Sequence, residues 1–386
     1  MSRILLIPDL PVEHWPSMDR YASRIVHHLH REAGTFEFEV ASEISSLTKA
    51  NGKAPSRRDS GSGSRRLADE GSVSEMRRYI SRYYLYPRRI RSMKGDALHV
   101  LDHSYAHIVL SERSRPCLLT VHDLFPIMTV RRSTEVLRDR IRNRFLGRVL
   151  RGLKRADSWI VATEWLREQL CEWLGQEERV HVIPFGVDEA FFELPQDDRA
   201  LFRARHEIPE STFVILHVGS VDKRKNIPAI IAVLDQLRGE GLDAWFLQVG
   251  GSLTSEQQAD LSKRGLTDYV TQFGPAAEEE LQNAYHAADL LLFPSHYEGF
   301  GFPVLEAMAS GLPVVTSGAG GLTEVAGDAA VIVPSRESKP YVEEIKKLAE
   351  GTDWRAELIA RGRDRASQFT WSNTAIETAK VYETLA

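Results

Sequence analysis

The chain contains 386 residues, of which 42% are hydrophobic and 27% are charged, and its formal net charge is -5. This composition is typical of a globular protein, and the length predicts two domains of ordinary size. The acidic balance argues against an overall basic nucleic-acid binder, and we expect no nucleic acid among the partners.

The cysteine content and the hydropathy pattern indicate the cellular compartment in which the protein is expected. Cys117 and Cys171 are the only cysteines, and they have neither a metal-ligand spacing nor the number that a disulfide framework needs. No stretch of the sequence approaches the roughly 18 consecutive apolar residues of a membrane span. The sequence therefore favours a protein of the reducing cytoplasm.

Short runs rich in Ile, Val and Leu alternate with longer helical patterns along the first half, which is typical of parallel βαβ units. The predicted strands span 4–8, 99–102, 117–123, 158–163 and 180–184. In parallel α/β sheets the carboxyl ends of the strands line the ligand site. The residues expected at that edge are Asp9, Asp102, His103, His122 and Asp123.

One segment, residues 49–95, concentrates positive charge, with thirteen Lys and Arg residues against four Asp and Glu. Its first part, 49–75, is polar and rich in glycine and serine, and it predicts a mobile loop. Its second part interleaves arginine with Tyr, Leu and Ile, and it predicts a basic amphipathic helix up to Pro87. Two interpretations stay open. The aromatic residues of a solvated helix could pack on the sheet, or residues 77–94 could contact an anionic membrane or a phosphorylated acceptor.

The boundary between the two predicted domains lies near Asp188, in a stretch rich in proline and charge. Beyond it, the same alternation predicts strands at 214–220, 244–250, 270–274, 290–295, 313–317 and 330–334. We therefore expect one domain at 1–187 and a second at 188–367. The tail, 368–386, predicts a helix capped by Thr370 or Ser372. Its expected packing positions include Trp371, Ala375, Ala379, Val381 and Tyr382.

Two glutamates, Glu298 and Glu306, flank a glycine-aromatic loop that follows the predicted strand at 290–295. Pro303 suits the first turn of a helix, and the free N–H groups and positive dipole end of a helix N-terminus favour phosphate. Glu306 would lie in that first turn. A carboxylate accepts two hydrogen bonds side by side, which suits vicinal sugar hydroxyls. The alternative is that Glu306 only stabilises the helix start and Glu298 is an exposed charge.

Arg224 and Lys225 lie just beyond the carboxyl end of the predicted strand at 214–220, before a helix that starts at Asn226. Together they could neutralise a diphosphate, Arg through a bidentate fork and Lys as a point charge. In isolation, such a pair would be interpreted as a solvated turn. A second glycine loop, 317–325, follows the strand at 313–317 and leads into a helix, although a plain tight turn has the same pattern.

Taken together, these motifs resemble the retaining glycosyltransferases of family 4, which have the GT-B fold of two Rossmann-like domains facing a cleft. Glu298 and Glu306 are separated by seven residues that include the glycine-aromatic loop, and this motif is specific for the group and its close relatives. The resemblance covers most of the chain. Residues 99–107 and 119–127 resemble a branch of the family that assembles bacterial polysaccharides and glycolipids. The resemblance implies that the C-terminal helix crosses back onto the N-terminal domain.

The resemblance also implies roles for individual residues. Arg224 and Lys225 would bind the pyrophosphate of a nucleotide-sugar donor, and Glu306 would take the ribose hydroxyls. Glu298 would contact the donor sugar, and His122 would face it from the other domain. Further residues expected to bind the donor are Gly219, Ser220, Gly299, Phe300, Gly301, Phe302 and Pro303.

Three residues of the first domain keep a second interpretation. A lone histidine at a strand end, such as His122, is usually a hydrogen-bonding residue, and only the motif context favours the functional role. Asp102 and His103 are open between that structural role and binding of the acceptor.

One stretch departs from the family pattern. The family usually has a glycine-rich turn after the first strand, whereas no glycine stands between Pro8 and Ile25 in this chain. A backbone without glycine approaches a ligand less freely. We expect Ser17, Met18 and Asp19 to take the place of that turn.

The expected function is retaining, metal-independent transfer of a hexose-type sugar from a UDP- or GDP-sugar to a glycan or lipid-linked acceptor. We expect no metal or other cofactor, because two cations and a helix N-terminus around the leaving diphosphate can stabilise its charge. His122, Glu298, Arg224 and Lys225 form the expected catalytic set.

Two alternatives remain from different classes. One is a nucleotide-sugar epimerase on the same fold, and the other is a catalytically degenerate nucleotide-sugar-binding protein. For the enzyme we expect a cytoplasmic location, with peripheral contact at the inner face of the cell membrane through residues 77–94.

Overall fold

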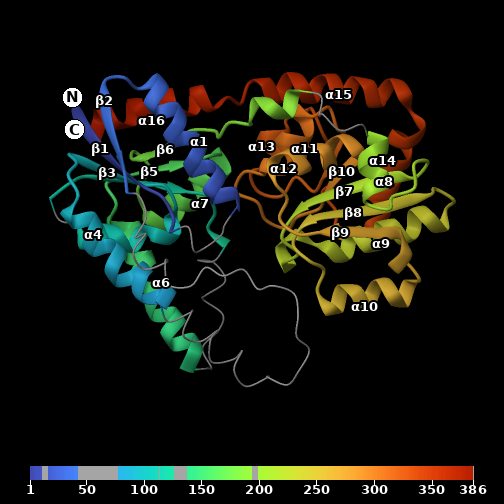
Figure 1. The fold of residues 1–386 in the computed structure, drawn as a ribbon, viewed down its shortest axis with the longest axis horizontal. Coiled ribbons are helices and arrows are strands. Elements are labelled where there is room, and N and C mark those ends of the chain that lie inside the picture. Colours follow the sequence, from blue (N-terminus) through green and yellow to red (C-terminus); the bar gives the residue numbers. More distant parts are fainter. Residues whose placement is uncertain (11–15, 42–76, 113, 126–136, 194–198, 386) are drawn as a thin grey trace.

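The computed structural model describes residues 1–10, 16–41, 77–112, 114–125, 137–193 and 199–385. Within these ranges, two six-stranded sheets form two lobes that lie side by side, with helices around each sheet (Figure 1). Neighbouring strands are parallel throughout both sheets. The predicted α/β class with two Rossmann-like sheets is therefore confirmed.

The N-terminal sheet has the strand order β2-β1-β3-β4-β5-β6. Its strands are β1 (Ser2–Ile7), β2 (Phe36–Val40), β3 (Ala97–Val100), β4 (Cys117–Val121), β5 (Ser158–Val161) and β6 (Val180–Val182). The sequence analysis missed β2, which lies at the edge of the sheet and pairs with β1. Its sequence alternates apolar and acidic residues, which is the period of a half-exposed strand, so the signal was present.

The C-terminal sheet has the strand order β12-β11-β10-β7-β8-β9. Its strands are β7 (Phe213–Gly219), β8 (Ala244–Gly250), β9 (Val270–Phe273), β10 (Leu290–Phe293), β11 (Val314–Thr316) and β12 (Val331–Ile332). All six coincide with predicted runs, because each is a short apolar run closed by a proline, glycine or serine.

The helices of the N-terminal lobe are α1 (Pro16–Glu32), the π-helix η2 (Ser81–Leu85), α4 (Tyr86–Ser92), the 3-10 helix η3 (His103–Ser111), α6 (Leu137–Arg155) and α7 (Glu164–Leu174). The C-terminal lobe has η4 (Glu189–Phe192), α8 (Arg199–Arg205), η5 (Lys223–Lys225), α9 (Ile227–Gly239), α10 (Ser255–Arg264), η6 (Thr267–Tyr269), α11 (Glu278–Ala287), α12 (Phe302–Ala309), α13 (Leu322–Ala326), α14 (Ser338–Glu350) and α15 (Thr352–Ser367). No helix in the described ranges is both long and apolar enough to cross a membrane.

The last helix, α16 (Trp371–Leu385), crosses back onto the N-terminal lobe and lies beside α1, so that both chain ends are on the same side (Figure 1). The crossing confirms the expectation from the family resemblance. Thr370 caps the helix by accepting the N–H of Asn373 at 3.1 Å. Near the other end, the hydroxyl of Tyr382 hydrogen-bonds to Nδ1 of the buried His99 at 2.6 Å, which ties the helix to the sheet.

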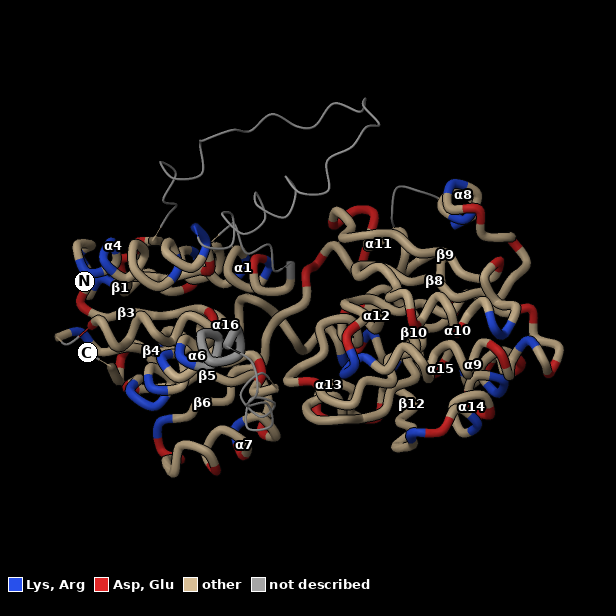
Figure 2. Tube along the Cα trace, turned by 90° about the horizontal axis from the view of Figure 1, so that it is seen from below, with Lys and Arg blue, Asp and Glu red and all other residues tan. Residues whose placement is uncertain are grey.

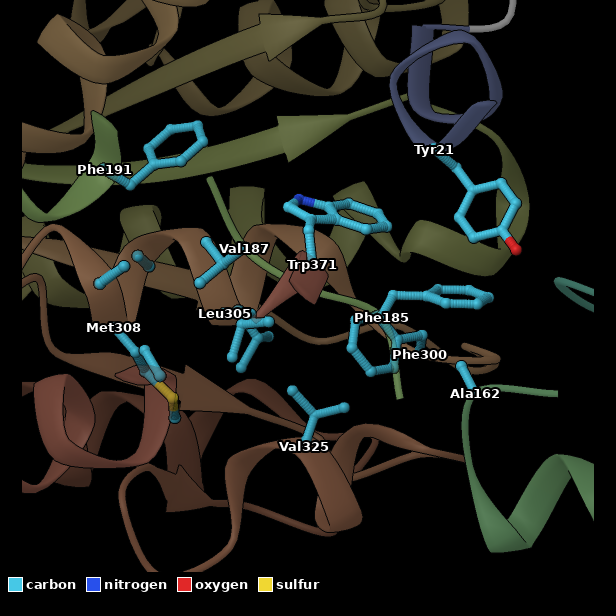
Figure 3. Packing of buried hydrophobic residues seen from close by; sticks show 14 of the residues in the cluster. Tyr21, Ala162, Phe185, Val187, Phe191, Phe300, Leu305, Met308, Val325 and Trp371 are labelled. Carbon is cyan, nitrogen blue, oxygen red and sulfur yellow. The ribbon is translucent and has the colours of Figure 1, made fainter. Parts of the chain in front are cut away.

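The two lobes share one hydrophobic cluster where the linker passes between them. Phe185 of the linker lies between Tyr21 of α1 and Phe300 of the C-terminal lobe (Figure 3), with ring centroids 4.7 and 5.2 Å away. Trp371 closes the cluster from α16, and its indole donates to Asp188 at 3.0 Å. Gly186 is required here, because a Cβ on it would stand 2.3 Å from the backbone nitrogen of Trp371.

The basic segment differs from its prediction. Residues 49–75 lie outside the described residues, and the helix does not stop at Pro87 but continues through the π-helix η2 into α4, which ends at Ser92. Pro87 stands where the π-helix gives way to α4, and because it has no N–H to donate it interrupts the ladder of backbone hydrogen bonds at that point. Tyr79 and Tyr83 stack on Phe145 of α6, which supports the packing interpretation for these aromatic residues.

The buried His99 gives the fold a testable pH dependence. Burial lowers the pKa of His99 to about 3 from its ordinary 6.5. Between these values the unfolded chain binds a proton that the folded chain does not, so stability is lost as the pH falls below 6.5. One such group contributes a slope of at most about 1.4 kcal/mol per pH unit. We expect His99→Gln to reduce the dependence of the free energy of unfolding on pH, measured by urea denaturation between pH 7 and 5.

The exposed His30 provides the matched control, because its ring lies at the surface of α1. His30→Gln should leave the slope of the wild type unchanged. An unchanged slope in His99→Gln would show that His99 is protonated without cost in the folded protein.

Candidate active site

A tight turn follows β7 and carries the two predicted cations. The carboxylate of Asp222 caps the turn by accepting the N–H of Arg224 at 3.0 Å. The turn is also fixed to the loop after β10, because the N–H of His296 donates to the carbonyl of Arg224 at 2.7 Å. The side-chain amide of Asn226 donates to the carbonyl of Pro294 at 3.2 Å. The turn and the loop are therefore held together as one unit.

Both cations converge on Glu298. The ammonium of Lys225 lies 2.7 Å from one carboxylate oxygen, and the guanidinium of Arg224 lies 3.3 Å from the other. Lys225 and Glu298 are each only 6% exposed. Burial lowers the pKa of Lys225, and the opposing charge of Glu298 counteracts that shift. Glu298 is thus a buried counter-ion, and the interpretation of it as an exposed surface charge is wrong.

Glu306 is the second predicted carboxylate, and its position in α12 differs from the prediction. It is the fifth residue of the helix and lies beyond the first turn, so its charge does not serve the helix start. Its side chain is 3% exposed. The hydroxyl of Tyr285 in α11 donates to one oxygen at 2.7 Å, and the guanidinium of Arg20 in α1 pairs with the other.

The glycine-aromatic loop leads into α12 as predicted, with Pro303 in the first turn and Gly301 as the N-cap at φ +104°. Only glycine adopts such a φ without strain. The second glycine loop packs directly against the first, because the N–H of Gly321 donates to the carbonyl of Glu298 at 2.9 Å. The turns after β7, β10 and β11 therefore meet at one edge of the C-terminal sheet, which is the edge formed by the carboxyl ends of its strands.

The glycine at the start of β7's turn also belongs to this edge. Gly219 has a φ of +138°, and the ammonium of Lys225 lies 3.6 Å from the place where a Cβ would stand. The hydroxyl of Ser220 donates to Asp222 at 2.6 Å, so it supports the cap of the turn. Gly219 and Ser220 are thus next to the cations, as the resemblance implies.

The N-terminal lobe places His122 opposite this edge. A Cβ on Gly299 would stand 2.0 Å from the carbonyl oxygen of His122, so the two backbones are in direct contact across the lobes. The ring of His122 is buried, and its Nε2 lies 2.8 Å from the carbonyl oxygen of Leu101. Burial lowers the pKa of the ring, which favours the neutral form. Its Nδ1 has no hydrogen-bond partner among the described residues.

An acidic pair lies beside His122 at the ends of β1 and β3. Asp102 accepts hydrogen bonds from the backbone and hydroxyl of Ser104 at 2.9 and 2.6 Å and lies 3.0 Å from Nδ1 of His103. Burial opposes ionisation of Asp102, but His103 outweighs it and the net effect lowers the pKa of the carboxyl. Burial and the neighbouring Asp102 raise the pKa of Asp9 to about 10. The neutral form is thus favoured at Asp9, and the charged form is favoured at Asp102.

Further contacts between the lobes were not predicted from the sequence. The hydroxyl of Thr163 donates to the carbonyl of Gly299 at 2.9 Å. Glu324 of α13 accepts the N–H groups of Glu164 and Trp165, at 2.7 and 2.6 Å, and so caps α7 of the other lobe. One signal was available in the sequence, because Thr163 stands two residues after the end of β5, near the edge that lines the site.

Two family models divide the chain between them. The model described as "Glycosyltransferase Family 4" matches residues 19–191, and the model described as "Glycosyl transferases group 1" matches residues 198–365. The chain belongs to the family 4 type of glycosyltransferases. Its fold is GT-B, and the resemblance inferred from the two glutamates and the glycine-aromatic loop is confirmed.

Individual relatives agree with this family. The chain is 33% identical to the O-antigen chain mannosyltransferase B of Escherichia coli over 173 residues, which are 44% of this chain and 45% of that protein. It is also 33% identical to a D-inositol 3-phosphate glycosyltransferase of Kineococcus radiotolerans over 248 residues, 59% of this chain and 57% of that protein. The chain thus spans about half the length of these two relatives.

A solved structure agrees over the whole length. The structure of HepE from Anabaena in complex with UDP and glucose matches with a TM-score of 0.75 at 16% identity, and the match covers 100% of both chains. At this identity the likeness concerns the fold. The match includes both lobes, since it covers the whole of each chain.

Loss of the buried counter-ion should destabilise the protein. In Glu298→Gln the ammonium of Lys225 would remain buried without its carboxylate, a situation that typically costs about 3–5 kcal/mol. We expect a loss of that order in the free energy of unfolding, measured by urea denaturation at pH 7. The control is Glu37→Gln, which breaks an exposed pair with Arg3 and should leave the free energy of unfolding nearly unchanged, since water screens such pairs. Equal stability of the two variants would contradict the role of Glu298 as a buried counter-ion.

Proposed function

We propose that the protein is a retaining, metal-independent glycosyltransferase that moves a hexose-type sugar from a UDP- or GDP-sugar to a glycan or lipid-linked acceptor. The observation that carries the proposal is the convergence of Arg224 and Lys225 on Glu298, beside the N-terminus of α12 and opposite His122. Two cations and a helix N-terminus form a positive environment of the kind that binds a diphosphate.

In the proposed reaction, the bond between the anomeric carbon of the sugar and the diphosphate oxygen breaks while negative charge develops on the diphosphate. Arg224 and Lys225 stabilise that charge, and one well-placed donor of this kind is typically worth several kcal/mol. The acceptor oxygen forms its bond on the face that the diphosphate leaves. The proton of the acceptor hydroxyl passes to the leaving phosphate oxygen, so that no protein nucleophile is needed.

The carboxylates have supporting roles in this proposal. Glu298 holds both cations at the edge of the sheet and presents its oxygens to the donor sugar. Glu306 binds the ribose hydroxyls, with Tyr285 holding the carboxylate in place from behind. His122, whose Nδ1 is buried, contacts the sugar from the N-terminal lobe. Contact between the lobes excludes water from the reacting centre, which limits hydrolysis of the donor.

The names of the relatives support the classes of substrate. HepE was crystallised with UDP and glucose, and the relative from Escherichia coli is called a mannosyltransferase of the O-antigen chain. The relative from Kineococcus radiotolerans is called a D-inositol 3-phosphate glycosyltransferase. These names favour a hexose donor and a polar acceptor that carries hydroxyl groups.

Two other functions would use the same donor site. An epimerase would isomerise the sugar of the donor without any acceptor, and a degenerate protein would bind the donor without turnover. Incubation of the protein with donor alone separates them, because only the epimerase yields an isomerised nucleotide sugar. Nucleotide release that depends on added acceptor would identify the transferase.

The two lysines of the turn after β7 allow a matched test of the cation's role. Lys225 is buried against Glu298, whereas Lys223 is exposed on the same turn. We expect Lys225→Ala to lower kcat about 100-fold or more, as for the loss of one transition-state donor. Lys223→Ala should remain within about twofold of the wild type in the same transfer assay, since an exposed charge contributes little. Near-wild-type turnover in Lys225→Ala, with the fold verified by circular dichroism, would remove Lys225 from the mechanism.

Peripheral contact with an anionic membrane is a further part of the proposal. Arginine and lysine recur along α4 and α6 of the N-terminal lobe (Figure 2). Ile80 and Tyr84 stand among them with 43% and 54% of their surface exposed. A neighbouring surface pocket of about 850 Å³ is lined in part by Arg91, Lys94 and Arg148. Exposed apolar side chains beside cations are typical of a surface that contacts lipid headgroups.

This membrane surface can be tested by sedimentation with vesicles that contain anionic lipid. The variant neutralises a set of arginines to glutamine: Arg77, Arg78, Arg88, Arg89 and Arg91. We expect it to lose most vesicle binding, because each basic residue near such a surface contributes about 1 kcal/mol. The control neutralises the same number of exposed lysines elsewhere: Lys223, Lys263, Lys339, Lys347 and Lys380. Equal binding of the two variants would contradict a localised membrane surface.

A further inference from the structure

The contact between Arg20 and Glu306 joins the two lobes at the site proposed for the ribose. Arg20 belongs to α1 of the N-terminal lobe and Glu306 to α12 of the C-terminal lobe. The guanidinium pairs with one oxygen of the carboxylate, and Tyr285 donates to the other at 2.7 Å. Glu306 is 3% exposed, so these two partners surround its polar end.

The two partners of Glu306 differ in how they are attached. Tyr285 lies on α11 of the same lobe as Glu306, so it stays in place when the lobes move relative to each other. Arg20 lies on the other lobe, and it withdraws when the lobes separate. Its side chain is 25% exposed, which leaves it a path to solvent. Only one of the two hydrogen-bonding partners is therefore removable.

A ribose diol and Arg20 require the same atoms. A diol gripped by a carboxylate donates hydrogen bonds to its oxygens side by side, and Arg20 already pairs with one of these oxygens, Oε1. Because Glu306 is only 3% exposed and Tyr285 holds the other oxygen from the same lobe, a diol reaches the carboxylate only when Arg20 withdraws. The contact also lies where this chain lacks the glycine-rich turn of its family, and α1 begins there instead with Pro16.

We propose that Arg20 is an internal competitor of the nucleotide donor, which occupies the ribose-binding carboxylate until the donor displaces it. The proposal rests on the proposed function, and it concerns the regulation of the same site. In the absence of donor, Arg20 neutralises the buried charge of Glu306 and holds the lobes together. Donor binding then has to break this contact, so the apparent affinity is lower than that of the freed site.

Arg24 supplies a matched control on the same helix face. It lies four residues after Arg20 and pairs with Asp188 of the linker at 2.7 Å and with Glu278 of α11 at 2.8 Å. Replacement of Arg24 thus loosens the contact between α1 and the C-terminal lobe without touching Glu306. Any gain in affinity that both variants share reflects loosening of the lobes and not competition for the carboxylate.

The test is isothermal titration of the full chain with UDP, GDP and inorganic pyrophosphate. Coupling between two such sites is typically about 5- to 150-fold, and we expect Arg20→Ala to bind UDP or GDP about tenfold more tightly than the wild type. Its affinity for pyrophosphate, which has no ribose, should be unchanged. Arg24→Ala should bind all three within about twofold of the wild type.

The outcomes separate this proposal from the proposed function. If Arg20→Ala binds nucleotide and the wild type shows no measurable binding, the role of Arg20 as a competitor is supported. If the wild type binds nucleotide and Arg20→Ala shows no gain in affinity, the role of Arg20 as a competitor is overturned and the proposed donor site stands. An equal gain in Arg24→Ala would have the same meaning. Absence of nucleotide binding in the wild type and in Arg20→Ala would overturn both proposals.

A measurement on the wild type keeps the test decisive if Arg20→Ala does not fold. Hydrogen exchange of the amides in α1 should increase when saturating UDP or GDP is added, because the helix loses its contact with Glu306. Added pyrophosphate should leave that exchange unchanged. Increased protection of α1 in the presence of the nucleotide would overturn the competitor, because it would mean that the donor tightens the contact.

Discussion

The relative position of the lobes depends on the packing of the linker against the segment that leads into α16. These two chain crossings touch so closely that Gly186 leaves no space for a Cβ beside Trp371. The N–H of Val187 donates to the carbonyl of Phe369 at 3.0 Å, and the indole of Trp371 donates to Asp188, so the crossings are also joined by hydrogen bonds. Because the crossings are fixed at one place, the carboxyl edges of the two sheets face each other beside them. Every polar contact between the lobes at the site follows from that geometry.

Within the C-terminal lobe, the decisive electrostatic feature is a buried carboxylate that holds two cations. A lysine with 6% exposure would tend to lose its proton, since burial disfavours the charged form. The carboxylate of Glu298 at 2.7 Å counteracts this effect of burial, because it favours the protonated form. An incoming diphosphate would meet charges that are already oriented, which is the condition under which electrostatic stabilisation is most effective. The same pairing makes the stability of the fold and the chemistry of the site depend on one residue.

The sequence allowed prediction of features that depend on short stretches. Arg224, Lys225 and Glu298 were placed correctly at one sheet edge because each lies on the loop that follows a strand of a parallel sheet, and such strand ends converge. Features that depend on distant stretches could not be predicted. Glu306 lies 286 positions from Arg20, and nothing in either local sequence indicates the pairing. The fifth position of Glu306 in α12 was also missed, because the helix begins at Phe302, one residue before Pro303, and Glu306 therefore lies beyond the first turn.

The contact of Glu324 with α7 offers a way to observe the motion of the two lobes. Trp165 donates its backbone N–H across the lobes to Glu324, and its indole packs edge-on against Tyr297 at 5.1 Å. When the lobes separate, the carboxylate leaves the backbone of Trp165 and the phenol ring leaves its indole, so the surroundings of the indole become more aqueous. Tryptophan emission depends on such surroundings, so the chain carries a natural optical probe of its own opening, with no need for an attached dye.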